Sequence, residues 1–164
     1  MRYIFYIIIV IPFIFQNCKK KENNFGTATL TFNGVARNFK VNGFEDELNN
    51  SNLFTYNAIY RENDLIQEVI ATYNVPKRIG KFELFISRSS KSSLNWYNHT
   101  DDVLEGELKL DTTQTGNEIE VTEINKSCTK IKGHFAASMV VIYGNRYGDS
   151  GTKIKVTGTF DLHK

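Results

Sequence analysis

The sequence predicts a single all-β domain, an antiparallel β-sandwich or β-barrel of about nine strands, and a lipocalin-like meander is one form of such a barrel. Apolar and polar residues alternate with a period of two in several short segments, which is the pattern of half-buried strands. The chain has 12 Phe and 8 Tyr but only 2 Pro, and aromatic residues favour strands. No segment has the periodicity of a convincing amphipathic helix.

The first predicted element is a hairpin near the start of the domain. In residues 27–32, apolar side chains alternate with threonines. Asn33-Gly34 follows, and this dipeptide suits the positive φ angles of a two-residue hairpin turn. The alternation resumes in residues 35–41. These two segments are therefore predicted to form the first two strands.

Further strands are predicted at short spacing along the rest of the chain. They cover residues 53–60, 65–73, 81–87, 105–110, 119–124, 131–143 and 153–162. The first two of these form a hairpin about residues 62–64. Short strands at such spacing, with turn residues between them, are typical of a sandwich or a barrel. The pattern does not distinguish these two architectures.

The longest irregular stretch is predicted at residues 87–103, which are rich in Ser and Asn and leave room for a short helix at 94–99. Trp96 and Tyr97 lie in it and are the predicted ligand-binding residues. An exposed aromatic pair in such a loop can stack on a sugar ring or anchor a partner, because aromatic side chains dominate binding hot spots. The alternative is that Trp96 pins the loop onto the β domain.

A short pattern, Gly-x-Phe, recurs at Gly80, Gly133 and Gly158. On a strand, this spacing places the Gly and the Phe on the same face. The Gly there either lets a bulky side chain of a neighbouring strand pack close or marks a bulge. The recurrence is too irregular for a solenoid or a propeller.

The N-terminal residues resemble the signal peptide of a bacterial lipoprotein. An apolar run follows Arg2 at residues 3–15. As a helix it spans about 20 Å, which is short for a membrane core of about 30 Å and suits a signal peptide. Cys18 comes next, directly before three lysines. We expect residues 1–17 to be removed and Cys18 to carry acyl chains such as palmitate. The alternative is an uncleaved signal anchor.

Lipid on Cys18 would fix the location of the protein. Two or three acyl chains anchor a protein stably, whereas one chain binds only marginally. Lys19 follows Cys18, in place of the Asp that resembles an inner-membrane retention signal, so an outer-membrane address is expected. Whether the domain faces the periplasm or the outside stays open. Residues 18–25 are then a lipidated tether, and residues 26–164 form the all-β domain.

Composition excludes two classes of protein. The 20 basic and 18 acidic residues are interspersed, so the basic stripe typical of a nucleic-acid-binding protein is missing. The chain has 2 Cys, and acylation of Cys18 leaves Cys128 without an intrachain partner, which excludes a disulfide framework. We expect Cys128 to be a small buried apolar residue. No cofactor is expected.

Two groups of polar residues are weighed as reaction centres, and neither fits. His99, Asp101 and Asp102 lie close in sequence, but their spacing matches neither the twelve-residue calcium loop nor a zinc-binding pair of histidines. We expect a solvated loop there and no metal. His134 would need an orienting carboxylate and a nucleophile for catalysis, and the sequence brings neither to it. An outward-facing position on a strand is expected.

The chain as a whole resembles the small uncharacterised outer-membrane lipoproteins of Bacteroidota that carry an all-β domain. The resemblance lies in residues 30–35, 131–135 and 155–161, together with Cys18. It implies an all-β domain at the outer membrane and no catalytic residue. The expected function is a non-enzymatic module that binds a glycan or another envelope protein. The alternatives are a small hydrolase with an unrecognised site and a barrel that carries a small hydrophobic ligand.

Overall fold

The computed structural model of the protein describes residues 24–32, 34–47, 50–63, 66–86, 91–100, 103–144 and 146–164. The predicted signal peptide, Cys18 and most of the tether lie outside these residues, so the lipoprotein assignment stays a prediction. Asn33 of the predicted first turn is also outside them. In the described part of the chain, no helix combines the length and the apolar character needed to cross a membrane.

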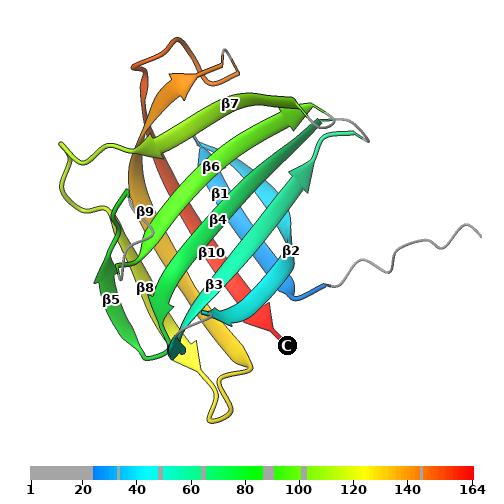
Figure 1. The fold of residues 1–164 in the computed structure, drawn as a ribbon, viewed down its shortest axis with the longest axis vertical. Coiled ribbons are helices and arrows are strands. Elements are labelled where there is room, and N and C mark those ends of the chain that lie inside the picture. The colour runs from blue at the N-terminus through cyan, green and yellow to red at the C-terminus, as the bar shows by residue number, and fades with distance from the viewer. Residues whose placement is uncertain are drawn as a thin grey trace, which may run out of the picture.

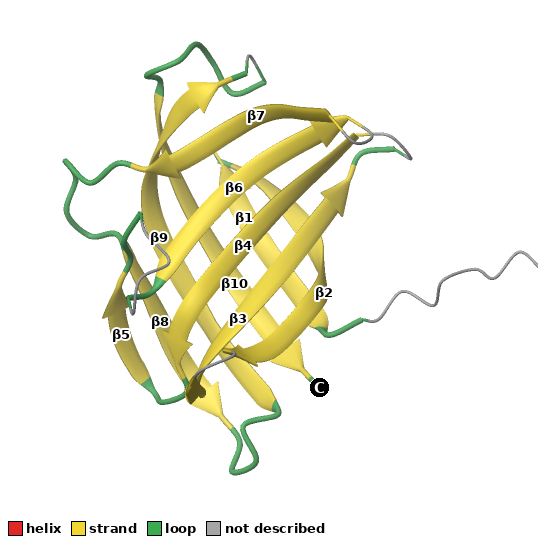
Figure 2. Ribbon diagram, viewed as in Figure 1, coloured by secondary structure: helices red, strands yellow, loops and turns green. Residues whose placement is uncertain are grey.

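The described residues form ten strands, which confirms the all-β class (Figures 1 and 2). The strands are β1 (Gly26–Phe32), β2 (Val35–Glu47), β3 (Asn50–Arg61), β4 (Ile66–Pro76), β5 (Gly80–Glu83), β6 (Ser93–Thr100), β7 (Val103–Leu110), β8 (Glu118–Ile124), β9 (Lys130–Tyr143) and β10 (Lys153–His163). They belong to one sheet, and the ladders between neighbouring strands are antiparallel.

The sheet closes on itself and forms a barrel. Its order runs β10-β1-β2-β3-β4-β6-β7-β9, and β9 pairs with β10 to complete the ring. The long strand β9 pairs with β7 near its C-terminal end and with β8 near its N-terminal end. Strand β5 pairs with β8, and Phe85 just after it bridges to Ser93 at the start of β6. Of the two architectures that the sequence left open, the barrel forms.

All nine predicted strands are present, but one strand was missed. The irregular stretch predicted at residues 87–103 is wrong in its second half, because Ser93–Thr100 form β6 between β4 and β7. Ser93 and Asn95 are polar yet buried on this strand, which hides the usual alternation. Strand β5 is shorter than predicted, and Ile86 beyond it is exposed.

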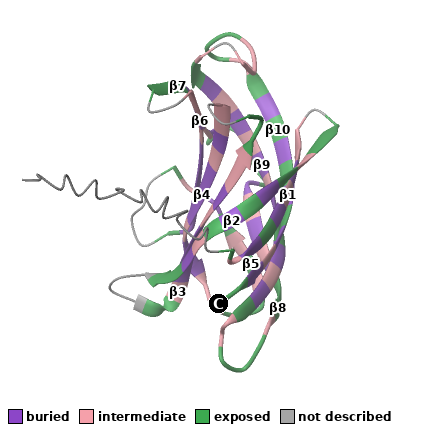
Figure 3. Cartoon of the chain, turned by 90° about the vertical axis from the view of Figure 1, so that its right-hand side faces the viewer, coloured by how far each residue is buried: buried purple, intermediate pink, exposed green. Residues whose placement is uncertain are grey.

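The barrel interior holds the core. Buried and exposed residues alternate along the strands, as Figure 3 shows for β10, so every second side chain points inward. Aromatic rings meet across the interior between strands that are not neighbours in the sheet. The Phe160 ring on β10 lies 5.3 Å from the Tyr56 ring and 6.5 Å from the Phe54 ring, both on β3. Side chains therefore fill this part of the barrel.

Two of the Gly-x-Phe patterns pack against each other on β9 and β10. Gly133 is the register partner of Phe160, and Gly158 is the register partner of Phe135. A Cβ atom on Gly158 would lie 2.5 Å from the Phe135 ring, and one on Gly133 would lie 2.4 Å from the Phe160 ring. Each Phe therefore lies over the Gly of the other strand. This confirms the close-packing explanation for Gly133 and Gly158, whereas at Gly80 a Cβ atom would meet only Phe82, at 3.6 Å.

Replacing Gly133 with Ala is expected to lower the free energy of unfolding by about 2–3 kcal/mol, the upper part of the range for overpacking a core. The new Cβ would also meet the backbone oxygen of Glu120 at 2.1 Å, and a strand backbone cannot move aside easily. Urea unfolding followed by circular dichroism measures the change. Gly43→Ala is the control, because a Cβ there would meet only Asn57, at 3.5 Å. Equal midpoints for the two variants would contradict the close approach.

Candidate functional site

One end of the barrel, which we call the mouth, carries the polar groups of the interior. The up-and-down order of antiparallel strands places the β1–β2, β3–β4, β6–β7 and β9–β10 connections at this end. The described chain starts at Asn24 and ends at Lys164 at the opposite end, where β1 begins and β10 finishes (Figure 1). The mouth is therefore the end of the barrel opposite Asn24, the first described residue.

Strand register arranges the inward side chains near the mouth in layers. Tyr60, Glu68, Asn98 and Gly106 are successive partners across β3, β4, β6 and β7, and we call them the mouth layer. The next layer inward consists of apolar partners on the same strands: Ala58, Ile70, Trp96 and Leu108. The change from polar to apolar between adjacent layers marks the mouth as a distinct site.

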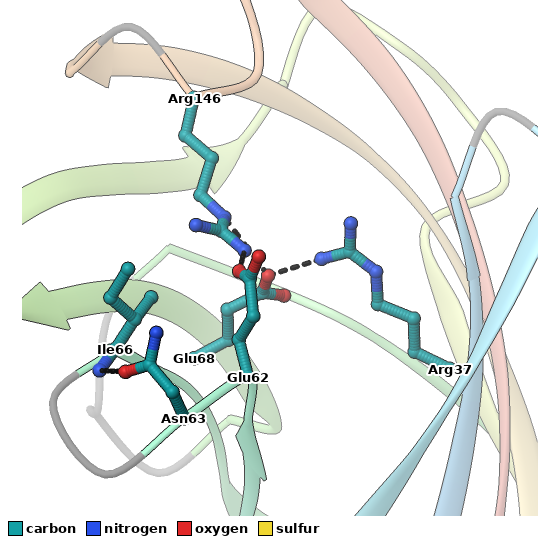
Figure 4. Close-up of polar contacts among 6 residues, drawn as sticks. All are labelled: Arg37, Glu62, Asn63, Ile66, Glu68 and Arg146. Carbon is teal, nitrogen blue, oxygen red and sulfur yellow. Dashed lines mark hydrogen bonds and ion pairs between the residues drawn. The ribbon is translucent and has the colours of Figure 1, made fainter.

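Glu68 is the centre of an ion-pair cluster at the mouth (Figure 4). Its side chain is fully buried, and its Oε1 atom accepts hydrogen bonds from Arg37 Nη1 and, at 3.1 Å, from Arg146 Nε. Arg146 also donates from Nη2 to Glu62. The Arg37 guanidinium lies 5.4 Å from the Tyr60 ring centroid, a cation–π distance. The cluster thus joins β2, β4, the end of β3 and the β9–β10 connection.

Electrostatics holds Arg146 and Glu62 in their charged forms. Burial alone would lower the pKa of Arg146, but its hydrogen bond to Glu62 and the charge of Glu68 raise this pKa above the ordinary value. The same hydrogen bond lowers the pKa of Glu62. With Arg37 and Glu68, the cluster contains two Arg and two Glu, so its formal charges balance.

The β9–β10 connection covers the mouth with Tyr147, the neighbour of Arg146. The Tyr147 ring lies 4.8 Å from the Phe32 ring and 5.4 Å from the Trp96 ring. Burial raises the pKa of the Tyr147 phenol, and the nearby charge of Glu68 raises it further. One turn therefore supplies an aromatic ring to the apolar layer and a guanidinium to the mouth layer.

Two buried polar atoms next to the Glu68 cluster, Asn98 Oδ1 and Trp96 Nε1, have no hydrogen-bond partner in the described chain. Glu68 also has the Tyr147 hydroxyl as a hydrogen-bonding neighbour. A buried donor or acceptor without a partner destabilises a fold by about 1–3 kcal/mol, and each one in a native structure calls for an explanation. A partnerless donor and a partnerless acceptor, two residues apart on the inner face of β6 and beside the ion-pair cluster, make the mouth the candidate binding site.

The predicted ligand-binding pair lies differently from the expectation. Trp96 is on the inner face of β6 with 1% of its surface exposed, so the prediction of an exposed Trp in a loop is wrong. Tyr97 is half-buried on the opposite face, because neighbouring residues on a strand point to opposite sides. Both residues stay predicted ligand contacts. Of the two, only Trp96 borders the mouth.

Two further expectations concern His134 and Cys128. His134 faces outward on β9, as predicted, with Nε2 3.3 Å from Glu120 Oε2. Cys128 is not a buried apolar residue: it is half-buried in the β8–β9 turn and has a φ of 53°. The Asn125 side chain accepts hydrogen bonds from the backbone N–H groups of the two residues that follow Cys128, residues 129 and 130. This tight turn requires the left-handed conformation at Cys128.

The structure describes only part of the metal site that was considered at residues 99–102. His99 is half-buried on β6, whereas Asp101 and Asp102 lie outside the described residues. Within the described ranges, no three His, Cys, Asp or Glu side chains gather in a group that could hold a metal ion. The expectation that residues 99–102 form a solvated loop without a metal therefore stays a prediction.

Outside the Glu68 cluster, Asp111 fastens the β7–β8 connection to the start of β10. Lys153 Nζ lies 2.8 Å from Asp111 Oδ2, and the Thr113 backbone N–H donates to Asp111 Oδ1 at 3.0 Å. The Lys153 contact first, and then the Thr113 hydrogen bonds, lower the pKa of Asp111 from 3.8 to about 2. The ionised carboxylate therefore favours the folded state.

Replacing Asp111 with Asn is expected to destabilise the protein most above pH 4. Because the pKa of Asp111 is lower in the folded state, its contribution to stability is present above about pH 4 and is lost as pH falls to about 2. The difference in melting temperature between wild type and variant should shrink over that interval. Thermal unfolding at a series of pH values measures it. Asp149→Asn, at an exposed position, is the control, and a constant difference for Asp111→Asn would contradict the pairing.

Comparison with known proteins adds no relative to this picture. No protein-family model, no curated protein and no solved structure gives a significant match to the chain. The geometry of the mouth therefore carries the functional argument.

Sequence reasoning missed Arg37, Glu62, Glu68 and Arg146. One signal could have identified Glu68, because it lies between Ile66 and Ile70 in the alternation of β4. A charged residue in the inward phase of a strand is buried, and a buried charge needs a partner. The sequence does not show which residues are the partners, since Arg37 and Arg146 come from two other parts of the chain.

Proposed function

We propose that this protein is a non-enzymatic binding module of the bacterial cell envelope, attached to the outer membrane by lipid on Cys18. The lipid anchor rests on the resemblance of the N-terminal residues to a lipoprotein signal peptide. The binding site in this proposal is the mouth. The observation that carries it is the pair of buried polar atoms without partners in the described chain, Asn98 Oδ1 and Trp96 Nε1, beside the ion-pair cluster of Glu68.

The position of the mouth suits a binding site on an anchored protein. Chain extends by at most about 3.3–3.6 Å per residue, so the short segment from Cys18 to Asn24 reaches roughly 20–25 Å. Asn24 is at the end of the barrel opposite the mouth. A lipid on Cys18 would hold that end near the membrane and leave the mouth accessible from the surrounding solution.

Binding explains the mouth better than catalysis does. Both guanidinium groups donate to the same oxygen of Glu68, and a guanidinium cannot accept a proton. A catalytic triad instead links its carboxylate to a group that passes the proton on to a nucleophile. The arrangement around Glu68 therefore resembles a positioned polar surface more than an acid–base relay.

A hydrophobic ligand inside the barrel is less well supported. Phe39 and Trp96 make an edge contact with ring centroids 6.4 Å apart, and Phe54, Tyr56 and Phe160 contact one another deeper in the barrel. Such a ligand would have to displace these rings.

The anchor is tested by intact mass and by fractionation of the native envelope. The wild-type chain should carry the mass of its acyl chains and lack residues 1–17. Cys18→Ser should lose the acyl mass and leave the membrane fraction, whereas Cys128→Ser, which removes the other cysteine, should behave as wild type. Absence of acyl mass on Cys18 would contradict the proposal.

Binding at the mouth has a built-in reporter, because the chain contains a single Trp. Labelling with ¹⁵N-tryptophan gives one indole signal, from Trp96 Nε1 at the mouth. A polar extract of the native envelope, added to the mature protein in detergent, should shift this signal. A signal that stays unchanged at saturating extract would contradict binding at the mouth, whatever the class of ligand.

A further inference from the structure

We propose that the mouth binds a neutral ligand rich in hydroxyl groups, that is, a sugar or the sugar end of a glycan. The inference rests on the proposed binding function and gives the class of ligand. Three features of the mouth lead to it: the hydrogen-bonding capacity of the partnerless atoms, the balance of charge, and the aromatic walls.

The partnerless atoms require a ligand that both donates and accepts hydrogen bonds. Asn98 Oδ1 can only accept a hydrogen bond, and Trp96 Nε1 can only donate one. A hydroxyl group donates and accepts at once, so a ligand with several hydroxyl groups can satisfy both atoms. An anion without a hydroxyl group has no donor for Asn98 Oδ1.

The described charges around Glu68 oppose an ionic ligand there. Arg37 and Arg146 surround the buried Glu68, and Glu62 pairs with Arg146 at the outside. A cation that approached Glu68 would meet two guanidinium groups, and an anion would meet the buried carboxylate. Like charges brought together in a poorly solvated site repel strongly. A neutral polar ligand avoids both repulsions.

The walls of the mouth suit the C–H faces of a sugar ring. Phe32, Trp96 and Tyr147 form edge or tilted contacts with one another, and Tyr60 lies in the mouth layer. Gly106 completes that layer on β7, where a Cβ atom would come within 2.8 Å of Asn98 Oδ1. The absence of a side chain at Gly106 therefore makes room for the buried amide of Asn98.

The Trp96 indole signal of the mature protein in detergent distinguishes the ligand classes. Glucose, galactose and N-acetylglucosamine are titrated as neutral probes, and inorganic phosphate and methylammonium as charged probes at matched ionic strength. At least one sugar should shift the signal in a saturable way, and neither ion should do so. If an ion alone shifts the signal, the mouth still binds a ligand but the neutral class is wrong.

Asn98→Leu tests whether the acceptor on β6 contributes to binding. The side chains are similar in size, and replacing the buried, partnerless Oδ1 atom by an apolar group should preserve the fold. Sugar affinity should fall at least about tenfold. Thr72→Val is the matched control, since Thr72 Oγ1 is also a buried side-chain oxygen but faces the Tyr56 hydroxyl two pairs deeper along β4. It should leave sugar affinity unchanged.

Three results would overturn the inference. The first is a panel in which no sugar shifts the indole signal while the envelope extract does, which would leave the binding function standing. The second is equal sugar affinity of Asn98→Leu and wild type in folded protein. The third is an equal loss of affinity in Thr72→Val, which would show a general effect of core substitution.

Discussion

Replacing Trp96 with alanine is expected to lower the free energy of unfolding by about 3–5 kcal/mol, the usual effect of truncating a large buried aromatic side chain. Only 1% of the Trp96 surface is exposed, and its ring contacts Phe32, Phe39 and Tyr147. The cavity cannot collapse easily, because β6 is hydrogen-bonded to strands on both sides. Urea unfolding followed by far-ultraviolet circular dichroism is the suitable measurement, since the variant has no Trp fluorescence.

Two companion variants make this result interpretable. Tyr97→Ala removes the neighbouring aromatic side chain from the outer face of β6 and should have a clearly smaller effect. Trp96→Phe keeps a ring in the core and should fall between wild type and Trp96→Ala. A loss below about 1 kcal/mol for Trp96→Ala would show that the ring is not part of the core.

The error at Trp96 shows where single-sequence reasoning stops. Hairpins such as β1–β2 could be predicted because alternation and a turn dipeptide are local signals. Strand β6 has no such signal, since its inward and outward positions both include polar residues. It forms because β4 and β7 satisfy its backbone from both sides, and strand formation depends on such neighbours more than on intrinsic preference.

The pairing of Gly133 with Phe160 is an intermediate case. The Gly-x-Phe spacing indicated that a Gly and a Phe share a face, and it offered close packing as one reason. The identity of the partner strand required the register of β9 and β10. A sequence pattern can therefore predict that space is needed at a position without showing which side chain occupies it.

The mouth could not be predicted from the sequence, because it too depends on contacts between strands that are distant in the chain. Arg37, Glu68 and Arg146 are far apart in the chain and meet only because the barrel closes between β9 and β10. Each residue alone has the character of a solvated surface charge. The inward position of Glu68 in the alternation of β4 indicates that its side chain is buried. The identity of its partners depends on contacts between distant segments.

Replacing Glu68 with leucine is expected to lower the free energy of unfolding by about 3 kcal/mol. Removal of one partner from a buried ion pair typically destabilises a protein by about 3–5 kcal/mol, because the remaining charge is buried without compensation. The lower end applies here, since the Arg37 and Arg146 side chains are 29% and 24% exposed and keep part of their hydration. Arg37→Met should cost less, because Arg146 still pairs with Glu68.

A triple variant separates the ion pairs from simple packing. In Glu68→Leu/Arg37→Met/Arg146→Met, no charge is left buried without a partner, and Glu62 is half-exposed and can be solvated. Replacing a whole buried ion pair by apolar side chains is often neutral, so the triple variant should recover most of the stability lost in Glu68→Leu. Urea midpoints measure the recovery. If the three changes instead destabilise the protein additively, the loss in Glu68→Leu does not come from two unpaired guanidinium groups, and the polar mouth is then maintained by packing rather than by charge.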